Sequence, residues 1–120
     1  MKVLQTIGVA GSSQTPGIFM YRRTPSYVEI YDEKGQNIIN VSNDDWRYLL
    51  RFIKKEEKST FQLSRGDHSL YEILRIVSTK RSLGWNDFIK ARIIAIMEHE
   101  GSIDHHGGNA GAIMLINAMS

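Results

Sequence analysis

The sequence contains no cysteine, and this absence excludes three kinds of chemistry. A chain without cysteine has no disulfide framework, no thiol nucleophile and no thiolate ligand for zinc. The absence also suits a reducing compartment, because disulfides form and persist mainly in oxidising surroundings. We therefore expect neither a stapled secreted scaffold nor a cysteine-dependent enzyme.

Long hydrophobic runs are also missing from the sequence. No apolar stretch approaches the roughly 18 residues that a bilayer-spanning helix needs. Near the N-terminus, residues 3–7 alternate in polarity and are too few for the hydrophobic core of a secretory signal. These absences predict a cytoplasmic protein with no membrane partner.

The chain has little net charge. It carries 15 lysine and arginine residues against 13 acidic residues, giving a formal charge of +2 and an isoelectric point near 9.0. Such a mild basic bias permits contact with phosphates without requiring it, because nucleic-acid binders usually concentrate charge on one face. The basic pairs at 22–23, 54–55 and 80–81 are interleaved with acids or serines, which is typical of a solvated surface.

Length and composition predict one domain. The chain has 120 residues, of which 42% are hydrophobic and 23% charged, as expected of a globular protein with its own core. No internal repeat, low-complexity tract or long linker divides it. We expect a single domain over residues 1–120, with mainly strands in residues 1–41 and mainly helices in residues 42–120.

The N-terminal third of the sequence carries strand signals. Segments rich in β-branched and aromatic residues occupy Ile18–Arg23 and Tyr27–Tyr31, and the residues between them supply a turn. Gly35 ends a second turn and is placed to adopt a positive φ angle. With the alternating residues 2–9 and the segment 37–41, which contains Ile38, Ile39 and Val41, these segments predict an antiparallel meander of three or four strands.

Beyond Ser42 the apolar period changes from two residues to 3.6. Ser42 opens a sequence that resembles a capping box, in which a side chain accepts from the first free backbone amides of a helix. Trp46, Leu49 and Ile53 then follow at helical spacing. The pattern predicts a first helix that fades near residue 58.

Two further helices are predicted from their N-terminal capping residues. Ser69 and Glu72 predict the start of a second helix over residues 69–79. Asn86 is placed to cap a third helix that ends at Gly101. This third helix is apolar around most of its circumference, so we expect it to be the central one.

The C-terminal segment is ambiguous. Residues 113–116 are four adjacent apolar residues, which fit a buried helix and a strand about equally. We favour a fourth helix over residues 110–119, and leave residues 60–63 as either a short strand or a loop. The whole pattern predicts an α+β fold, with an N-terminal antiparallel β-meander of three to four strands packed against three to four helices.

Three of the four histidines lie close together in residues 99–106. Imidazole and carboxylate groups are good ligands for divalent transition metals, and a turn at Gly101 could bring His99 towards Asp104 and His106. The spacing matches no recognised metal motif. The alternative is a polar connection between two buried segments, with His99 placed favourably at the negative end of a helix dipole.

Other catalytic and cofactor motifs are absent. The sequence contains no Gly-x-Ser-x-Gly nucleophile elbow, no Walker A loop and no Gly-x-Gly-x-x-Gly fingerprint. We therefore expect no cofactor, apart from the metal that the histidine cluster could hold.

The predicted hairpin over residues 18–31 offers a candidate binding surface. A three-residue loop at 24–26 would place one aromatic and mixed-charge set on a single face. That set is Phe19, Tyr21, Arg23, Tyr27, Glu29 and Tyr31. The opposite set would then pack on the helices: Ile18, Met20, Val28 and Ile30. A two-residue turn would change which residues share a face, and helices covering the aromatic face would make it core instead.

The leading hypothesis is a small non-enzymatic binding protein that contacts another protein, as inhibitors, immunity proteins and regulatory partners do. It rests on the lack of a convincing catalytic set, on the aromatic face and on the apolar C-terminal segment over residues 110–119. Either of the last two could form an interface, and the C-terminal segment could join two copies in a homodimer.

Two alternative functions remain open. The first is nucleic-acid binding through a basic surface. Its candidate residues are Arg22, Arg23, Arg47, Arg51 and Lys54. The second is a metal-dependent enzyme centred on His99, Asp104 and His106.

Overall fold

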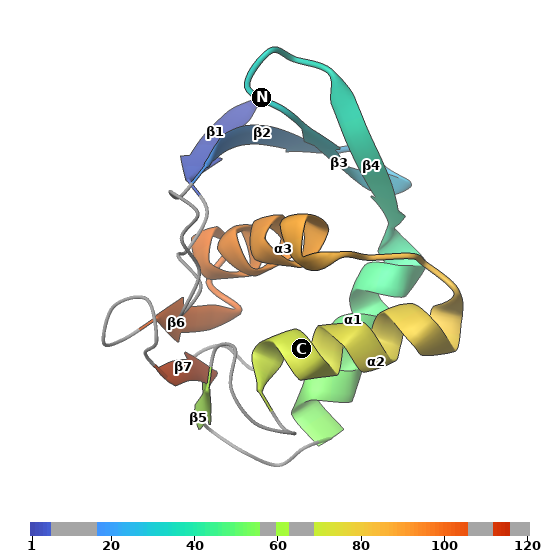
Figure 1. Ribbon diagram of the computed structural model, residues 1–120, viewed down its shortest axis with the longest axis vertical. Helices are drawn as coiled ribbons and strands as arrows, with labels where there is room; N and C mark the ends of the chain where they lie inside the picture. Colours follow the sequence, from blue (N-terminus) through green and yellow to red (C-terminus); the bar gives the residue numbers. More distant parts are fainter. Residues whose placement is uncertain (6–16, 56–59, 63–68, 106–111, 116–120) are drawn as a thin grey trace.

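A four-stranded antiparallel sheet forms the N-terminal layer of the computed structural model, which describes residues 1–5, 17–55, 60–62, 69–105 and 112–115 (Figure 1). Its strands follow one another in sequence order. They are β1 (Lys2–Gln5), β2 (Ile18–Arg23), β3 (Tyr27–Tyr31) and β4 (Asn37–Ser42). The sheet confirms the predicted α+β class with N-terminal antiparallel strands.

The turn between β2 and β3 contains two residues rather than the three assumed above. The Thr24 amide donates to the Tyr27 carbonyl at 2.8 Å, which closes the turn around Pro25 and Ser26. The Thr24 hydroxyl also accepts from the Tyr27 amide at 2.9 Å. Arg23 therefore pairs with Val28, and the register expected for a three-residue loop is wrong.

The turn between β3 and β4 is built by an aspartate and a glycine. The Asp32 carboxylate accepts from the amides of Lys34 and Gln36, each at 2.9 Å. Gly35 adopts a φ of 85°, a left-handed conformation that costs glycine little because it lacks a Cβ atom. This local chemistry explains why the turn was predictable from sequence.

Helix α1 (Asn43–Lys55) follows β4 directly. The Ser42 hydroxyl accepts from the Asp45 amide at 3.1 Å, which is the cap expected from the sequence. Trp46, Leu49 and Ile53 are buried, as their helical spacing predicted.

Helices α2 (Leu70–Arg81) and α3 (Asp87–His99) also begin at their predicted caps. The Ser69 hydroxyl accepts from Glu72, and the Asn86 side chain accepts from Ile89. Helix α2 ends at Ser82, a non-glycine residue in the left-handed conformation with a φ of 56°.

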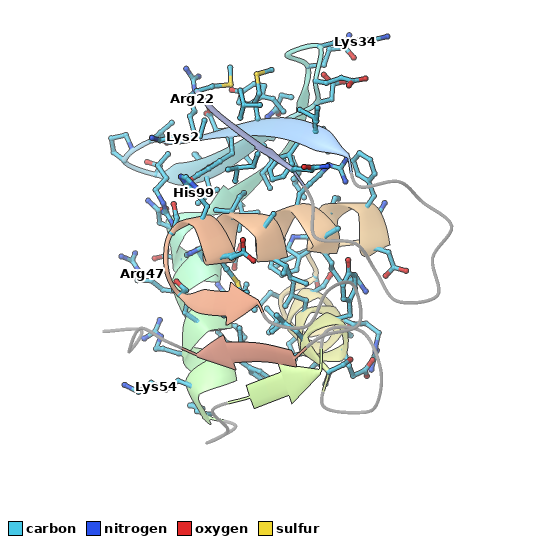
Figure 2. All side chains as sticks on the ribbon, turned by 90° about the vertical axis from the view of Figure 1, so that its left-hand side faces the viewer. Lys2, Arg22, Lys34, Arg47, Lys54 and His99 are labelled. Carbon is cyan, nitrogen blue, oxygen red and sulfur yellow. The ribbon has the colours of Figure 1, made fainter. Side chains whose placement is uncertain are left out.

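Helix α3 lies between the four-stranded sheet and the rest of the fold (Figures 1 and 2). It contacts β1 on one side and β6 on the other. Its middle is buried around the whole circumference, including Ile93, Ile94 and Ile96. The expectation that this helix is central is confirmed by these contacts.

A second antiparallel sheet lies beyond α3 and has the strand order β5-β7-β6. Its strands are β5 (Thr60–Gln62), β6 (Ile103–His105) and β7 (Ala112–Leu115). The predicted fourth helix over residues 110–119 is therefore wrong at residues 112–115. A short run of adjacent apolar residues has no periodicity that distinguishes a helix from a strand. Here β5 and β6 supply backbone hydrogen-bond partners on both sides of the run, which makes it a strand.

Candidate functional site

The four-stranded sheet presents one face to the helices and turns the other away from them (Figure 1). Side chains alternate between these faces, and the inward set includes the buried Phe19, Tyr21, Val28 and Ile30. We call the other set the outer sheet face. It includes Val3, Gln5, Ile18, Met20, Arg22, Tyr27, Glu29, Tyr31 and Asn40.

The six residues expected to share one aromatic face are divided between the two faces. Phe19, Tyr21 and Arg23 belong to the inward set, whereas Tyr27, Glu29 and Tyr31 belong to the outer sheet face. The cause is the two-residue turn, because a one-residue change of register moves every side chain of a strand to the opposite face.

The expected inward set is divided for the same reason. Val28 and Ile30 are buried as predicted, but Ile18 and Met20 lie on the outer sheet face. The prediction that these four residues pack together on the helices is therefore wrong for two of them.

Apolar side chains form a continuous row across the outer sheet face. Val3 pairs with Met20, which in turn pairs with Tyr31 on the next strand. Ile18 adjoins this row on the same strand as Met20. Val3 is 64% exposed, Ile18 54% and Tyr27 44%. No segment among the described residues covers this row.

An ion pair divides the apolar row from Tyr27. The Arg22 Nε donates to Glu29 Oε1 at 2.5 Å, and the Tyr31 hydroxyl donates to the same oxygen at 2.7 Å. The hydrogen bond from Tyr31 and the one from Arg22 hold the pKa of Glu29 below its ordinary value. The charges of Arg22 and Glu29 cancel, so the outer sheet face presents fixed polar groups without net charge.

On the inward side, Arg23 ties the end of β2 to the end of α3. Its Nε and Nη2 atoms donate to the two carboxylate oxygens of Glu100, each at 2.6 Å. The Tyr21 hydroxyl donates to Glu100 at 3.1 Å. Burial, followed by the negative charge of Glu100, raises the pKa of Tyr21 to about 12. This cluster joins two elements that are far apart in the sequence.

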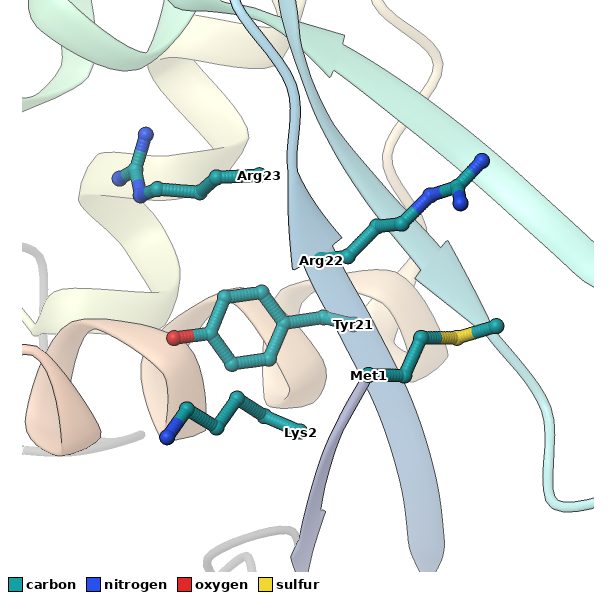
Figure 3. A pocket seen from close by; sticks show the side chains of 5 residues that line it. All are labelled: Met1, Lys2, Tyr21, Arg22 and Arg23. Atoms are coloured by element: carbon teal, nitrogen blue, oxygen red, sulfur yellow. The ribbon is translucent and has the colours of Figure 1, made fainter.

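A hollow of about 430 Å³ lies at the same end of the sheet. Figure 3 shows Lys2, Tyr21 and Arg23 extending to one side of β2, and Met1 and Arg22 extending to the other. The space therefore runs around the sheet edge. Because Tyr21 and Arg23 are already bound to Glu100, and Arg22 to Glu29, the hollow has few uncommitted polar groups.

The structure describes only part of the predicted metal site. His99 lies exposed in the last turn of α3, with its ring 6.1 Å from the ring of Tyr21 in an edge-on arrangement. Asp104 lies in β6, but its side chain and all of His106 lie outside the described residues. Within the described part of the chain, no three histidine, aspartate or glutamate side chains are grouped to hold a metal.

A second hollow of about 470 Å³ lies between α1 and α2. We call it the helix groove. It is lined by Tyr48, Arg51, Phe52 and Lys55 of α1 and by Lys80 of α2. The four α1 residues are spaced i, i+3, i+4 and i+7, so they form one stripe along the helix, beside the buried stripe of Trp46, Leu49 and Ile53.

The five residues predicted to bind nucleic acid do not form one surface. Arg22 and Arg23 lie on opposite faces of the sheet, and each is paired with a glutamate. The other three lie on α1, from which Arg47 and Lys54 extend outward (Figure 2). Of these three, Arg47 is paired with Asp44, and Arg51 lines the helix groove.

Sequence reasoning missed the aromatic and lysine residues of the helix groove. The signal was present in the spacing of Tyr48, Phe52 and Lys55, which repeats every three to four residues. The contribution of Lys80 could not be found in this way, because it depends on how α2 packs against α1.

No described helix has the length and apolar composition needed to cross a membrane. A comparison of the whole chain with protein families, curated proteins and solved structures found no match. The outer sheet face and the helix groove are the two surfaces of the described fold whose side chains suit a binding partner.

Proposed function

We propose that this chain is a small protein-binding module whose interface is the outer sheet face. The observation that carries the proposal is the exposed apolar row, in which Val3 and Ile18 are each more than half exposed. The largest contiguous apolar patch on a folded monomer is often an interaction site. Covering this row with a partner would remove its surface from water and stabilise the complex.

The composition of the outer sheet face favours a protein partner. Tyrosine, methionine and arginine are enriched at protein interfaces, and the face contains Tyr27, Tyr31, Met20 and Arg22. Its single ion pair leaves no excess positive charge to attract a polyanion. The partner surface is therefore expected to be largely apolar, with polar groups that match Arg22 and Glu29.

Tyr31 is the expected anchor of this interface. Its hydroxyl is held by Glu29, and the Arg22 guanidinium lies 5.8 Å from the centre of its ring. A ring fixed before binding loses little conformational freedom when the partner arrives. A module of this kind acts by contact rather than by catalysis, as an inhibitor, an immunity protein or a regulatory partner does.

The test compares two single substitutions on exposed apolar residues. Ile18→Asp places a charge in the apolar row, whereas Phe88→Asp places the same charge on α3, at a residue of similar exposure (46%). Each variant is used as bait in its own cells, and captured proteins are quantified by mass spectrometry. We expect Ile18→Asp to lose at least about tenfold of one specific partner that Phe88→Asp retains.

Two results would contradict the proposal. One is equal capture by both variants, with circular dichroism showing that both are folded. The other is a wild-type dimer in sedimentation that Ile18→Asp dissociates, because the face would then belong to a second copy of this chain.

A further inference from the structure

The helix groove gathers three positively charged side chains, of which Arg51 also donates from Nε to the Arg47 carbonyl at 3.4 Å. Arg51, Lys55 and Lys80 have no carboxylate partner among the described residues. The neighbouring Arg47 and Arg81 are instead paired with Asp44 and Asp45, each at 2.8 Å. Cations near helix C-termini offset the helix dipole, but that effect alone does not require cations from two helices to line one hollow.

Aromatic surface accompanies these cations. The rings of Tyr48 and Phe52 are stacked, with 6.2 Å between their centres and 27° between their planes. The Arg81 guanidinium, held by Asp45, lies 4.9 Å from the centre of the Tyr48 ring. The aromatic wall of the helix groove is therefore fixed in place before any ligand binds.

Cations beside a fixed aromatic pair match the two parts of a nucleotide. Phosphate oxygens pair with arginine and lysine, and bases stack on aromatic rings with little dependence on their identity. A volume of about 470 Å³ falls within the range of small-ligand sites. An acidic peptide would satisfy the cations but would leave Tyr48 and Phe52 without a matching group.

We propose that the helix groove binds a nucleotide, either free or as one unit of a single-stranded nucleic acid. Arg51, Lys55 and Lys80 hold the phosphate, and the base lies against the aromatic wall formed by Tyr48 and Phe52. The site is separate from the outer sheet face, so this inference does not depend on the proposed protein partner.

The experiment measures binding of AMP by calorimetry and of a fluorescent twelve-residue oligothymidylate by anisotropy. The groove variant carries Arg51→Gln, Lys55→Gln and Lys80→Gln. The control variant carries Lys2→Gln, Lys34→Gln and Arg75→Gln, and so loses the same charge outside the groove. We expect the groove variant to bind at least about tenfold more weakly than the control at low salt.

Two further measurements test the phosphate contacts and the base stacking separately: the salt dependence of affinity and the effect of removing the Phe52 ring. For the oligonucleotide, the slope of log affinity against log salt should become shallower by about 2 in the groove variant, because three phosphate contacts are lost. Phe52→Leu keeps an apolar wall but removes one ring, and should weaken binding by about tenfold. Binding of AMP with the same dependence on these residues assigns a free nucleotide, and binding of the oligonucleotide alone assigns a strand.

Three outcomes would overturn the inference. The first is no binding of either probe at low salt. The second is an equal loss in the groove and control variants, which would mean diffuse attraction by net charge. The third is binding that polyglutamate matches and that Phe52→Leu leaves unchanged. Thermal unfolding of each variant ensures that a loss of binding is not a loss of fold.

Discussion

Two tyrosine hydroxyls in this protein lie where water does not reach them freely. Tyr21 donates to Glu100, whereas the Tyr71 hydroxyl is buried with no hydrogen-bond partner among the described residues. Burial is the main cause that raises the pKa of each to about 12, with Glu100 and Asp87 as the next contributions respectively. An unfolded tyrosine has a pKa near 10.

These raised pKa values predict a loss of stability between pH 10 and pH 12. Below pH 10 both tyrosines are neutral in the folded and unfolded chain, so their contribution is complete. Above pH 10 the unfolded chain releases these protons while the folded protein keeps them, and unfolding becomes easier until about pH 12. Tyr21→Phe should reduce the slope of unfolding free energy against pH by up to about 1.4 kcal/mol per unit in this window.

Urea unfolding at several pH values measures that slope. Tyr27→Phe provides the matched control, because Tyr27 is 44% exposed on the outer sheet face. A Tyr21→Phe protein whose slope equals that of the wild type would show that Tyr21 does not carry the effect.

The division of the hairpin residues between two faces also originates at single residues. In β2, Ile18 and Met20 are apolar, and so are the alternating Phe19 and Tyr21. Hydrophobicity therefore does not decide which pair faces the helices. The length of the turn determines it instead, and the amide and hydroxyl of Thr24 close a two-residue turn. The sequence allowed a three-residue loop equally well.

Among the elements, those with a local signature were predictable from sequence. The starts of all three described helices match caps read from Ser42, Ser69 and Asn86, because a cap needs only a side chain within three residues of the amide that it accepts from. Strand β7 has no such signature. Its form depends on β5, which lies far from it in the sequence, as well as on β6, which comes shortly before it.

The end of α2 offers a test at the scale of one element. Ser82 adopts a φ of 56°, and its side chain makes no hydrogen bond within the described residues. A left-handed conformation is strained for any residue with a Cβ atom, and glycine relieves that strain. Ser82→Gly should raise the free energy of unfolding by about 0.5 to 1 kcal/mol, as measured by chemical denaturation.

The matched control places glycine three residues earlier, inside the same helix. Thr79→Gly should lower the free energy of unfolding by about 0.5 kcal/mol, because glycine is the poorer helix former. If both glycines destabilise the protein, the conformation of Ser82 is not the source of strain.

At the scale of the whole molecule, α3 is the helix against which both sheets pack. The four-stranded sheet packs against one side of it and β6 against the other, so neither layer is independent of the helix. Ile96 is fully buried in its middle. Ile96→Ala should lower the free energy of unfolding by about 3 kcal/mol, and Ile96→Val by about 1 kcal/mol, because the cavity left is smaller.

Trp fluorescence and far-ultraviolet circular dichroism should report the same transition in these variants. Trp46 lies in α1 and Trp85 lies between α2 and α3, so fluorescence reports on packing while dichroism reports on the helices and sheets. Two separate transitions in Ile96→Ala would show that the layers unfold independently of α3.

The strand order of the second sheet has a consequence for synthesis on the ribosome. Strands β1 to β4 are neighbours in the sequence, so each can pair as soon as the next has emerged. Strands β5 and β6 emerge before β7, the strand that lies between them and joins them. The nascent chain thus completes its first layer early and leaves β5 unpaired while both helices α2 and α3 are made, until residues 112–115 emerge, a period in which chaperone contact or a misplaced strand would have its greatest effect.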